Sequence, residues 1–278
     1  MTIAKLHLAF FSPGGTTEKV VRGVADGIRD ALPGLPVETI DLLSAETRRT
    51  PHVFGQEDLV VFGCMTAQKL FALSDEMFAC LEGRGTPMVG LATYGNGFYG
   101  IALKELARRA KERGFALAAA GAFPAQHSID PTAGAGRPDA SDLAAARAFG
   151  RQAAEKIAAG DLALRAELRT NWSHQDGPNK IIAWREEHPD EPYALPEAYK
   201  TKEFTEACVR CGLCARRCPV GAIDLPARSF DLAKCIGCWG CIVRCPRHAI
   251  RSTSKEMAEI VATYAPAYAK RLEPETFF

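Results

Sequence analysis

Short apolar runs alternate with helical patterns along the first part of the chain. The apolar runs are predicted strands and lie at residues 3–11, 37–41, 59–63, 88–92 and 115–122. Apolar residues recur at helical spacing in residues 18–32, 73–81, 101–113 and 143–159. Continuous apolar runs such as LVVFG are typical of strands covered on both faces. The alternation predicts an α/β fold with a doubly wound parallel sheet of five strands.

The rest of the chain has a different pattern. Residues 161–203 are polar and rich in proline, and either link two domains by wrapping between them or shield a cofactor. Residues 257–264 predict a helix that Pro266 interrupts, followed by a tail. The predicted division is a first domain at 1–160, a linker at 161–203, a second domain at 204–254 and a C-terminal helix and tail at 255–278.

Composition and charge exclude some classes of function. The chain is 47% hydrophobic and 24% charged, as ordinary globular proteins are, and its net charge is only +1. This balance argues against a nucleic-acid or membrane-surface binder. The apolar run at 3–11 is too short to span a bilayer and has no small-residue cleavage site. We expect a cytoplasmic protein without membrane insertion.

The cysteines are the most specific signal. Eight of the ten cysteines lie between residues 208 and 245, in two segments that superpose with a shift of 27 residues. Each segment reads C-x2-C-x2-C-x3-C-P. Three thiolates at three-residue steps can wrap one [4Fe–4S] cluster, while the fourth points to the other cluster. The predicted sets are therefore crossed: Cys208, Cys211, Cys214 and Cys245 in one, and Cys235, Cys238, Cys241 and Cys218 in the other.

Zinc is the alternative metal for these cysteines. Zinc ribbons use two CxxC pairs separated by a long loop, whereas this chain has three evenly spaced cysteines followed by CP. The spacing therefore favours iron–sulfur clusters. Eight basic and three acidic side chains lie between residues 206 and 251, and they either balance the anionic clusters or form a docking patch for an acidic partner.

A glycine-rich turn follows the first predicted strand and opens a helix. Glycines let the backbone approach an anion, and the first N–H groups of a helix attract phosphate. The turn is neither a Walker A loop nor a G-x-G-x-x-G fingerprint, and its alternative reading is a capped helix without a ligand. The candidate phosphate-binding residues are Ser12, Gly14, Gly15, Thr16 and Thr17.

Two further loops follow neighbouring strands and would converge with this turn at the carboxyl edge of the sheet. Tyrosines and glycines in the later loop suit a flat aromatic ligand, although they are also typical of ordinary turns. The candidate residues after the third strand are Cys64, Met65, Thr66 and Ala67. Those after the fourth strand are Thr93, Tyr94, Gly95, Asn96, Gly97 and Tyr99.

Residues 1–160 resemble flavodoxins. The residues that carry the resemblance are the Ser12–Thr17 turn and the TYGN segment that begins at Thr93. The resemblance implies the strand order 2-1-3-4-5 and bound FMN. Gly14 and Thr16 depart from the usual phosphate loop, and the third-strand loop lacks the aromatic residue often found beside the flavin. Cys64 either contacts the flavin or is a buried, inert thiol.

The cysteine segment resembles bacterial two-cluster ferredoxins over about 50 residues, which implies two [4Fe–4S] clusters, pseudo-twofold symmetry and one-electron transfer. The whole chain is similar to the flavodoxin–ferredoxin fusion proteins found mostly in anaerobes.

The predicted function is an iron–sulfur flavoprotein that relays single electrons between the two clusters and FMN and exchanges them with a redox partner protein. An FMN-dependent reductase of a small molecule, fed by the clusters, is the alternative, with His127 and Tyr99 as the nearby candidate residues. A third hypothesis is an iron–sulfur module whose first domain is empty and only docks partners. The sequence decides neither enzymatic activity nor oligomeric state.

Overall fold

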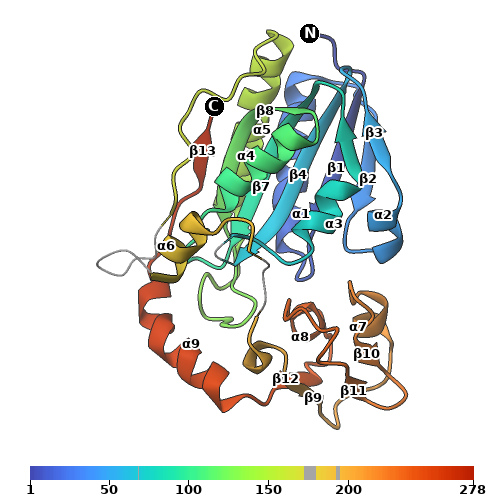
Figure 1. The fold of residues 1–278 in the computed structure, drawn as a ribbon, viewed down its shortest axis with the longest axis vertical. Helices are drawn as coiled ribbons and strands as arrows, with labels where there is room; N and C mark the ends of the chain where they lie inside the picture. Colours follow the sequence, from blue (N-terminus) through green and yellow to red (C-terminus); the bar gives the residue numbers. More distant parts are fainter. Residues whose placement is uncertain (68, 172–179, 192–194) are drawn as a thin grey trace.

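The computed structural model describes residues 1–67, 69–171, 180–191 and 195–278. Its main sheet contains the parallel strands β1 (Lys5–Phe11), β2 (Val37–Asp41), β4 (Asp58–Ala67), β7 (Thr86–Tyr94) and β8 (Phe115–Pro124). They lie in the order β2-β1-β4-β7-β8, which is the predicted order 2-1-3-4-5 counted along the chain (Figure 1). The α/β doubly wound fold is confirmed.

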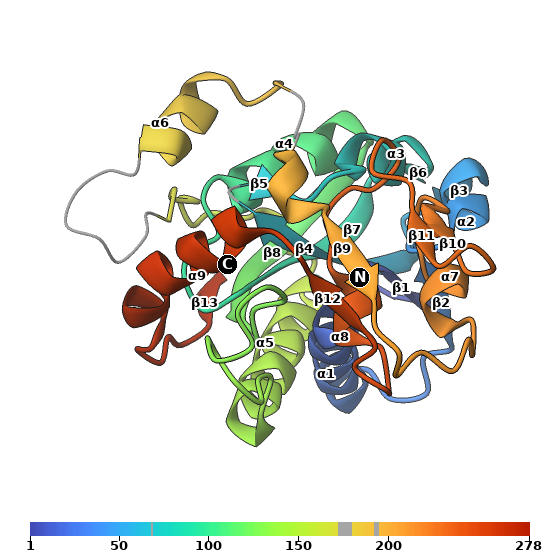
Figure 2. The same cartoon turned by 90° about the horizontal axis from the view of Figure 1, so that it is seen from below.

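Helices cover both faces of this sheet (Figure 2). The helices α1 (Thr16–Ala31) and α5 (Ala140–Ala158) pack on one face, and α3 (Ser74–Ala79) and α4 (Ala102–Glu112) on the other. The apolar positions of α1 recur every three to four residues, so the helix buries one face. The side chain of Asp139 accepts hydrogen bonds from the N–H groups of Ser141 and Asp142, and this fixes the start of α5.

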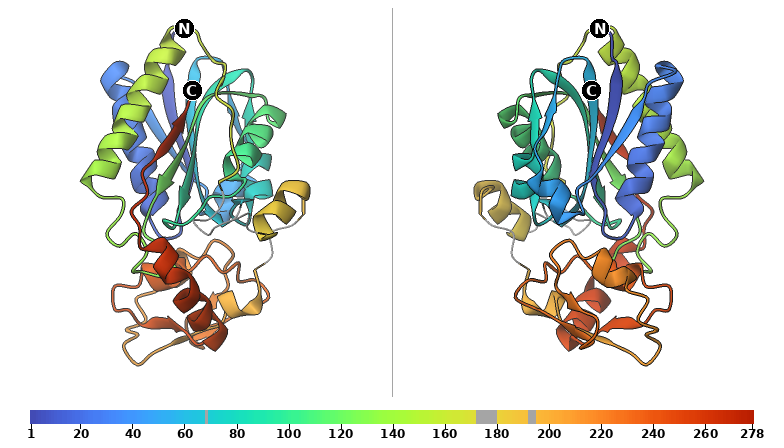
Figure 3. Two further views of the ribbon diagram at one scale, coloured as in Figure 1. Left: turned by 90° about the vertical axis from the view of Figure 1, so that its left-hand side faces the viewer. Right: turned by 90° about the vertical axis from the view of Figure 1, so that its right-hand side faces the viewer.

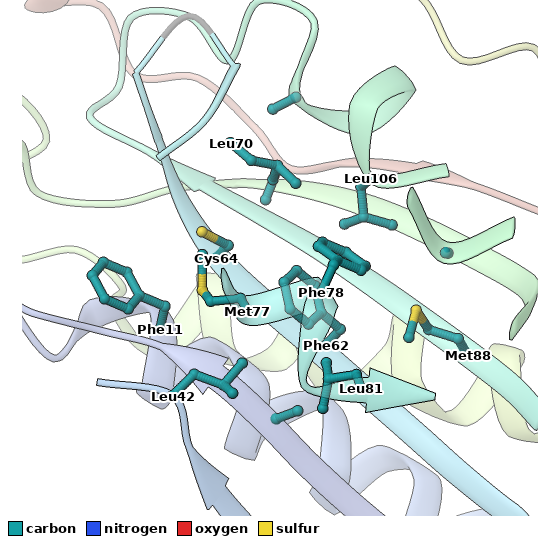
Figure 4. Packing of buried hydrophobic residues seen from close by; sticks show 14 of the residues in the cluster. Phe11, Leu42, Phe62, Cys64, Leu70, Met77, Phe78, Leu81, Met88 and Leu106 are labelled. Atoms are coloured by element: carbon teal, nitrogen blue, oxygen red, sulfur yellow. The ribbon is translucent and has the colours of Figure 1, made fainter. Parts of the chain in front are cut away.

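Two clusters of buried side chains form the core, one on each face of the sheet. The cluster beneath α3 and α4 contains Phe62, Phe78 and Leu106, which point toward one another in Figure 4. Burying each such side chain stabilises the fold by about 1.5–3 kcal/mol. Because both faces are buried, the strands read as continuous apolar runs in the sequence.

Several short elements complete the first domain and the connection after it. They are α2 (Ala45–Arg49), β3 (His52–Phe54), β5 (Lys69–Leu70), β6 (Leu81–Gly83), α6 (Lys180–Glu187) and the 3₁₀ helix η1 (Glu197–Tyr199). β3 pairs with β6, and β5 pairs with β4. The predicted linker thus contains a helix, and its residues 172–179 and 192–194 lie outside the described residues.

Residues 202–252, hereafter the cysteine module, form a small α+β unit. Its elements are β9 (Lys202–Phe204), α7 (Leu213–Arg216), β10 (Ile223–Asp224), β11 (Ser229–Phe230), α8 (Gly240–Val243) and β12 (Ile250–Ser252). β9 pairs with β12 and β10 with β11, both antiparallel. The helices α7 and α8 are 27 residues apart, as are the strands β10 and β12, so the sequence repeat is also a structural repeat.

The chain returns to the first domain after the cysteine module. Helix α9 (Lys255–Tyr268) continues through Pro266, so the predicted interruption there is wrong. The predicted tail then forms β13 (Glu275–Phe277), which pairs antiparallel with β8 at the edge of the main sheet. The module therefore connects to the first domain at both ends, and it lies beyond the carboxyl ends of the parallel strands (Figures 1 and 3).

No helix in the described ranges combines the length and apolar character that crossing a bilayer requires.

Candidate functional site

A cavity of about 210 Å³, hereafter the strand-end cavity, lies between the carboxyl ends of β4, β7 and β8 and the cysteine module. Parallel strands place their following loops at one edge, which is where ligands bind in open α/β sheets. Several predicted ligand-binding residues line the cavity together. They are Thr16, Met65, Thr66, Ala67, Thr93, Tyr94, Gly95 and Gly97.

The other residues of the predicted phosphate turn lie beside this cavity rather than in its lining. The hydroxyl of Ser12 accepts a hydrogen bond from the Glu18 N–H at 3.0 Å and so stabilises the first turn of α1. The Thr17 hydroxyl is bonded to the Thr93 hydroxyl at 2.6 Å. These contacts fix the turn where β1 meets α1, so both residues support its shape.

Three more predicted residues have structural partners instead of a place in the cavity wall. Cys64 is fully buried in the core near Phe11 and Met77 (Figure 4), and burial raises the pKa of its thiol to about 12. The amide of Asn96 donates to the Tyr268 carbonyl at 2.7 Å and so holds the end of α9. The fully buried Tyr99 donates its hydroxyl to Glu275 of β13.

The glycines of the loop after β7 make room for side chains of this chain. A β-carbon at Gly95 would lie 2.0 Å from the ring of His127, and one at Gly97 would lie 2.5 Å from the ring of Tyr268. These glycines therefore serve packing of His127 and Tyr268 against the loop. Both also line the strand-end cavity, so their service in close approach of a ligand stays a prediction. Of the two tyrosines proposed to stack on a ligand, only Tyr94 lines the cavity.

One side of the cavity wall was not predicted from the sequence. Residues from the linker, the cysteine module and α9 close it, namely Leu195, Tyr199, Gly237, Cys238, Met257, Ile260, Val261, Tyr264 and Tyr268. The α9 members recur at helical spacing along one face, and that periodicity was the available signal. The two linker members support the reading in which the linker shields a ligand.

Polar groups without partners lie in the cavity wall. Among the described residues, Thr66 Oγ1 and Asp130 Oδ2 are buried and have no hydrogen-bond partner. Buried polar atoms are normally paired, so these two atoms are available to a ligand. His127 Nδ1 accepts hydrogen bonds from the N–H groups of Ile129 and Asp130, and burial lowers the pKa of the imidazole. The neutral ring therefore carries its proton on Nε2.

Two smaller cavities lie inside the cysteine module, and each is surrounded by four cysteines. The outer cysteine cavity is lined by Cys208, Cys211, Cys214 and Cys245, and the inner cysteine cavity by Cys218, Cys235, Cys238 and Cys241. Each cavity takes three cysteines from one segment and the fourth from the other, which is the arrangement the sequence predicts. In the described part of the chain, the two cysteine sets included, no group of three or more Cys, His, Asp or Glu side chains is arranged to hold a single metal ion.

The surroundings of the cysteines repeat as the sequence does. Cys218 Sγ accepts a hydrogen bond from the Ala222 N–H, and Cys245 Sγ accepts one from the Ala249 N–H, both at 3.3 Å. Burial raises the pKa of the Cys238 thiol to about 11. Thiols bind metals as thiolates, so cluster assembly at this residue would release a proton.

The cysteine module contacts the glycine turn directly. Arg244 Nε donates to the Pro13 carbonyl at 2.7 Å, and its Nη2 donates to the Ser12 carbonyl at 3.2 Å. The same guanidinium fills the space beside Gly15, whose φ of 97° favours glycine. Gly240 packs so closely on Pro13 that a β-carbon there would lie 2.9 Å away. The two domains therefore meet at the predicted phosphate turn.

Comparison with known proteins agrees with this geometry in the cysteine module. A family described as 4Fe-4S binding domain matches residues 202–224 and 229–251. Among curated proteins, none matches the chain.

Solved structures similar to part of the chain include three flavodoxins. One from the domain Archaea is 16% identical, with 55% of this chain and 99% of that chain covered and a TM-score of 0.36. One from Streptococcus pneumonia TIGR4 is 19% identical, with 56% and 99% covered and a TM-score of 0.39. One from Megasphaera elsdenii is 15% identical, with 54% and 98% covered and a TM-score of 0.36. The strand order β2-β1-β4-β7-β8 itself defines the doubly wound fold.

Proposed function

We propose that this chain, a flavodoxin-like domain joined to a 4Fe–4S binding domain, is an electron-transfer protein that relays single electrons between two [4Fe–4S] clusters and FMN. The observation that carries the proposal is the position of Cys238, which lines both the strand-end cavity and the inner cysteine cavity. A flavin in the first cavity and a cluster in the second would therefore both lie against Cys238. Electron-transfer rates fall steeply with distance, so a shared wall favours transfer within one chain.

The two cysteine cavities suit [4Fe–4S] clusters because each offers four thiols, one for each iron. When bound, the clusters supply one-electron chemistry, and FMN supplies one- or two-electron chemistry. The protein's own contribution is to hold the groups close together, to limit the access of water and to tune them through hydrogen bonds to the sulfurs.

The strand-end cavity suits FMN on the evidence of its unpaired polar atoms. The Thr66 hydroxyl can donate a hydrogen bond and the Asp130 carboxylate can accept one, as the polar edge of a flavin ring requires. Tyr94 and Tyr264 supply apolar ring surface in the wall. The phosphate would lie at the start of α1, where Thr16 lines the cavity and the first helical N–H groups lack intrahelical acceptors.

A redox partner protein would exchange electrons at the outer cysteine cavity. Cys211 is exposed there, and the neighbouring Val209 is 63% exposed. Arg210 and Arg247 also line this cavity and are exposed, which favours a partner with an acidic face.

The test is an anaerobic reductive titration of the holoprotein with iron and flavin measured in the same sample. We expect about eight irons and one FMN per chain, since two [4Fe–4S] clusters contain eight irons. The flavin absorbance should change in the same titration as the clusters. A content near four irons, zinc in place of iron, or a flavin that stays oxidised while the clusters are reduced would contradict the proposal.

A small-molecule reductase is the second candidate function, and the observation that favours it is His127. Its neutral ring lines the strand-end cavity with a proton on Nε2, as a proton donor would. Turnover of small acceptors by the holoprotein with a reduced donor distinguishes it from an electron carrier, because a carrier shows no saturable turnover.

A further inference from the structure

A buried lysine of the cysteine module contacts one cysteine sulfur directly. Lys202 is 8% exposed, and its Nζ donates a hydrogen bond to Cys235 Sγ at 3.3 Å. The same ammonium lies 5.9 Å from the centre of the Phe230 ring. Within the described residues, no carboxylate forms an ion pair with Lys202, so its charge acts mainly on the inner cysteine cavity that it lines.

This contact breaks the symmetry of the module. The backbone N–H donors to Cys218 and Cys245 are repeated 27 residues apart, one for each cavity. Lys202 is not repeated, because the residue 27 positions later is Ser229, which is exposed and uncharged. The two cysteine sets therefore have matching backbone donors but differ in one buried positive charge.

We propose that Lys202 makes the inner cluster the more easily reduced of the two, so that electrons entering at the exposed Cys211 pass downhill toward the strand-end cavity. This inference rests on the proposed function. Reduction adds negative charge to the cluster and its thiolates. A charged N–H donor at Cys235 stabilises that added charge, and hydrogen bonds to the sulfurs are among the features that set cluster potentials.

Other charges near the two cavities do not cancel this difference. Arg210 and Arg247 line the outer cavity but are exposed, so water and salt screen them. Arg217 lines the inner cavity but pairs with Asp41 at 3.0 Å.

Burial of the anionic inner cluster would act in the opposite direction. However, all four inner cysteines and three of the four outer ones have intermediate exposure, and only Cys211 is exposed. Burial nevertheless raises the pKa of the inner Cys238 and Cys241 thiols, to about 11 and about 12, so the inner set is the more buried of the two. In such surroundings the charge of the buried Lys202 acts more strongly on its cluster than the exposed arginines act on the outer one, and it offsets the effect of burial.

The test is a potentiometric titration of the reconstituted full chain, with the reduced clusters followed by electron paramagnetic resonance. We expect two separate midpoint potentials in the wild type, the higher one belonging to the inner cluster. We expect Lys202→Met to lower this higher potential, by an amount that corresponds to about a tenfold change in the equilibrium constant for reduction, since hydrogen bonds from charged groups contribute on this scale. For one electron, this corresponds to about 59 mV. Lys234→Met is the matched control, because Lys234 is adjacent to Cys235 but exposed and paired with Asp231.

The outcomes separate this inference from the proposed function. The inference is supported if the higher of the two midpoint potentials falls in Lys202→Met and changes little in Lys234→Met, with eight irons in both variants. Eight irons with unchanged midpoints, or a shift of the lower midpoint, overturns it and leaves the relay intact. If Lys202→Met does not retain eight irons, Lys202→Gln, which keeps a neutral donor, gives the same comparison. A wild-type content near four irons overturns the proposed function itself.

Discussion

Arg244 connects the two domains at the turn where the flavin phosphate is predicted, and its removal tests whether docking of the module shapes that turn. The change is Arg244→Met, which keeps an unbranched apolar chain but removes the guanidinium. The variant loses the hydrogen bonds to the Pro13 and Ser12 carbonyls, at 2.7 and 3.2 Å.

The size of the effect follows from these two bonds. A hydrogen bond from a charged group contributes about 1.5–3 kcal/mol, but the side chain is 26% exposed and water replaces part of each bond. We therefore expect docking of the module to weaken by about 2 kcal/mol, which corresponds to about 30-fold. Because coupling between sites is reciprocal, FMN affinity can fall by at most the same factor through this contact.

The assay is a titration of flavin-depleted protein with FMN, followed by quenching of flavin fluorescence. We expect the Kd for FMN to rise by about 10- to 30-fold in Arg244→Met. Arg247→Met is the matched control, since Arg247 is an exposed arginine of the same module. Arg244→Lys keeps the charge without the two-pronged contact. A Kd within about twofold of wild type, or an equal rise in Arg247→Met, would refute the reasoning.

Two further predictions concern the cysteine sets and pH. Cys218→Ser should lose the cluster whose other ligands lie in the later segment, so iron should fall from about eight to about four per chain. Cys80→Ser, at a buried thiol of the first domain, should keep about eight, and equal iron in the two variants would contradict the crossed sets. Burial lowers the pKa of His127 in the folded state, so the unfolded chain binds the proton first as pH falls below about 6.5. The Tm should therefore drop more between pH 7.5 and 5.5 in the wild type than in His127→Asn, and identical drops would contradict this.

The sequence predicted the main sheet because its strands carry their own signal. β4 and β7 are buried on both faces, so their apolar runs are continuous and were recognised without tertiary information. β13 carries no such signal. It is a three-residue strand that forms only because the edge of β8 is available to it, and a short segment after Pro266 reads as a tail.

The site was predicted where it depends on chain order and missed where it depends on packing. Loops after parallel strands converge by topology, so Thr16, Thr66 and Thr93 were placed correctly at one cavity. Asn96 and Tyr99 belong to the same loop but point to α9 and β13, whose positions no local pattern gives. The crossed cysteine sets were predictable because the spacing itself limits which thiols can share one cavity.

The most direct test of the relay is the kinetics of electron transfer within the chain. The clusters of the anaerobic holoprotein are reduced by a rapid pulse, and the flavin absorbance is then followed at several protein concentrations. Because Cys238 is a common wall of the two cavities, we expect the flavin to change with a single first-order rate that is independent of protein concentration. A rate that rises in proportion to protein concentration, or a flavin that does not respond, would contradict the account.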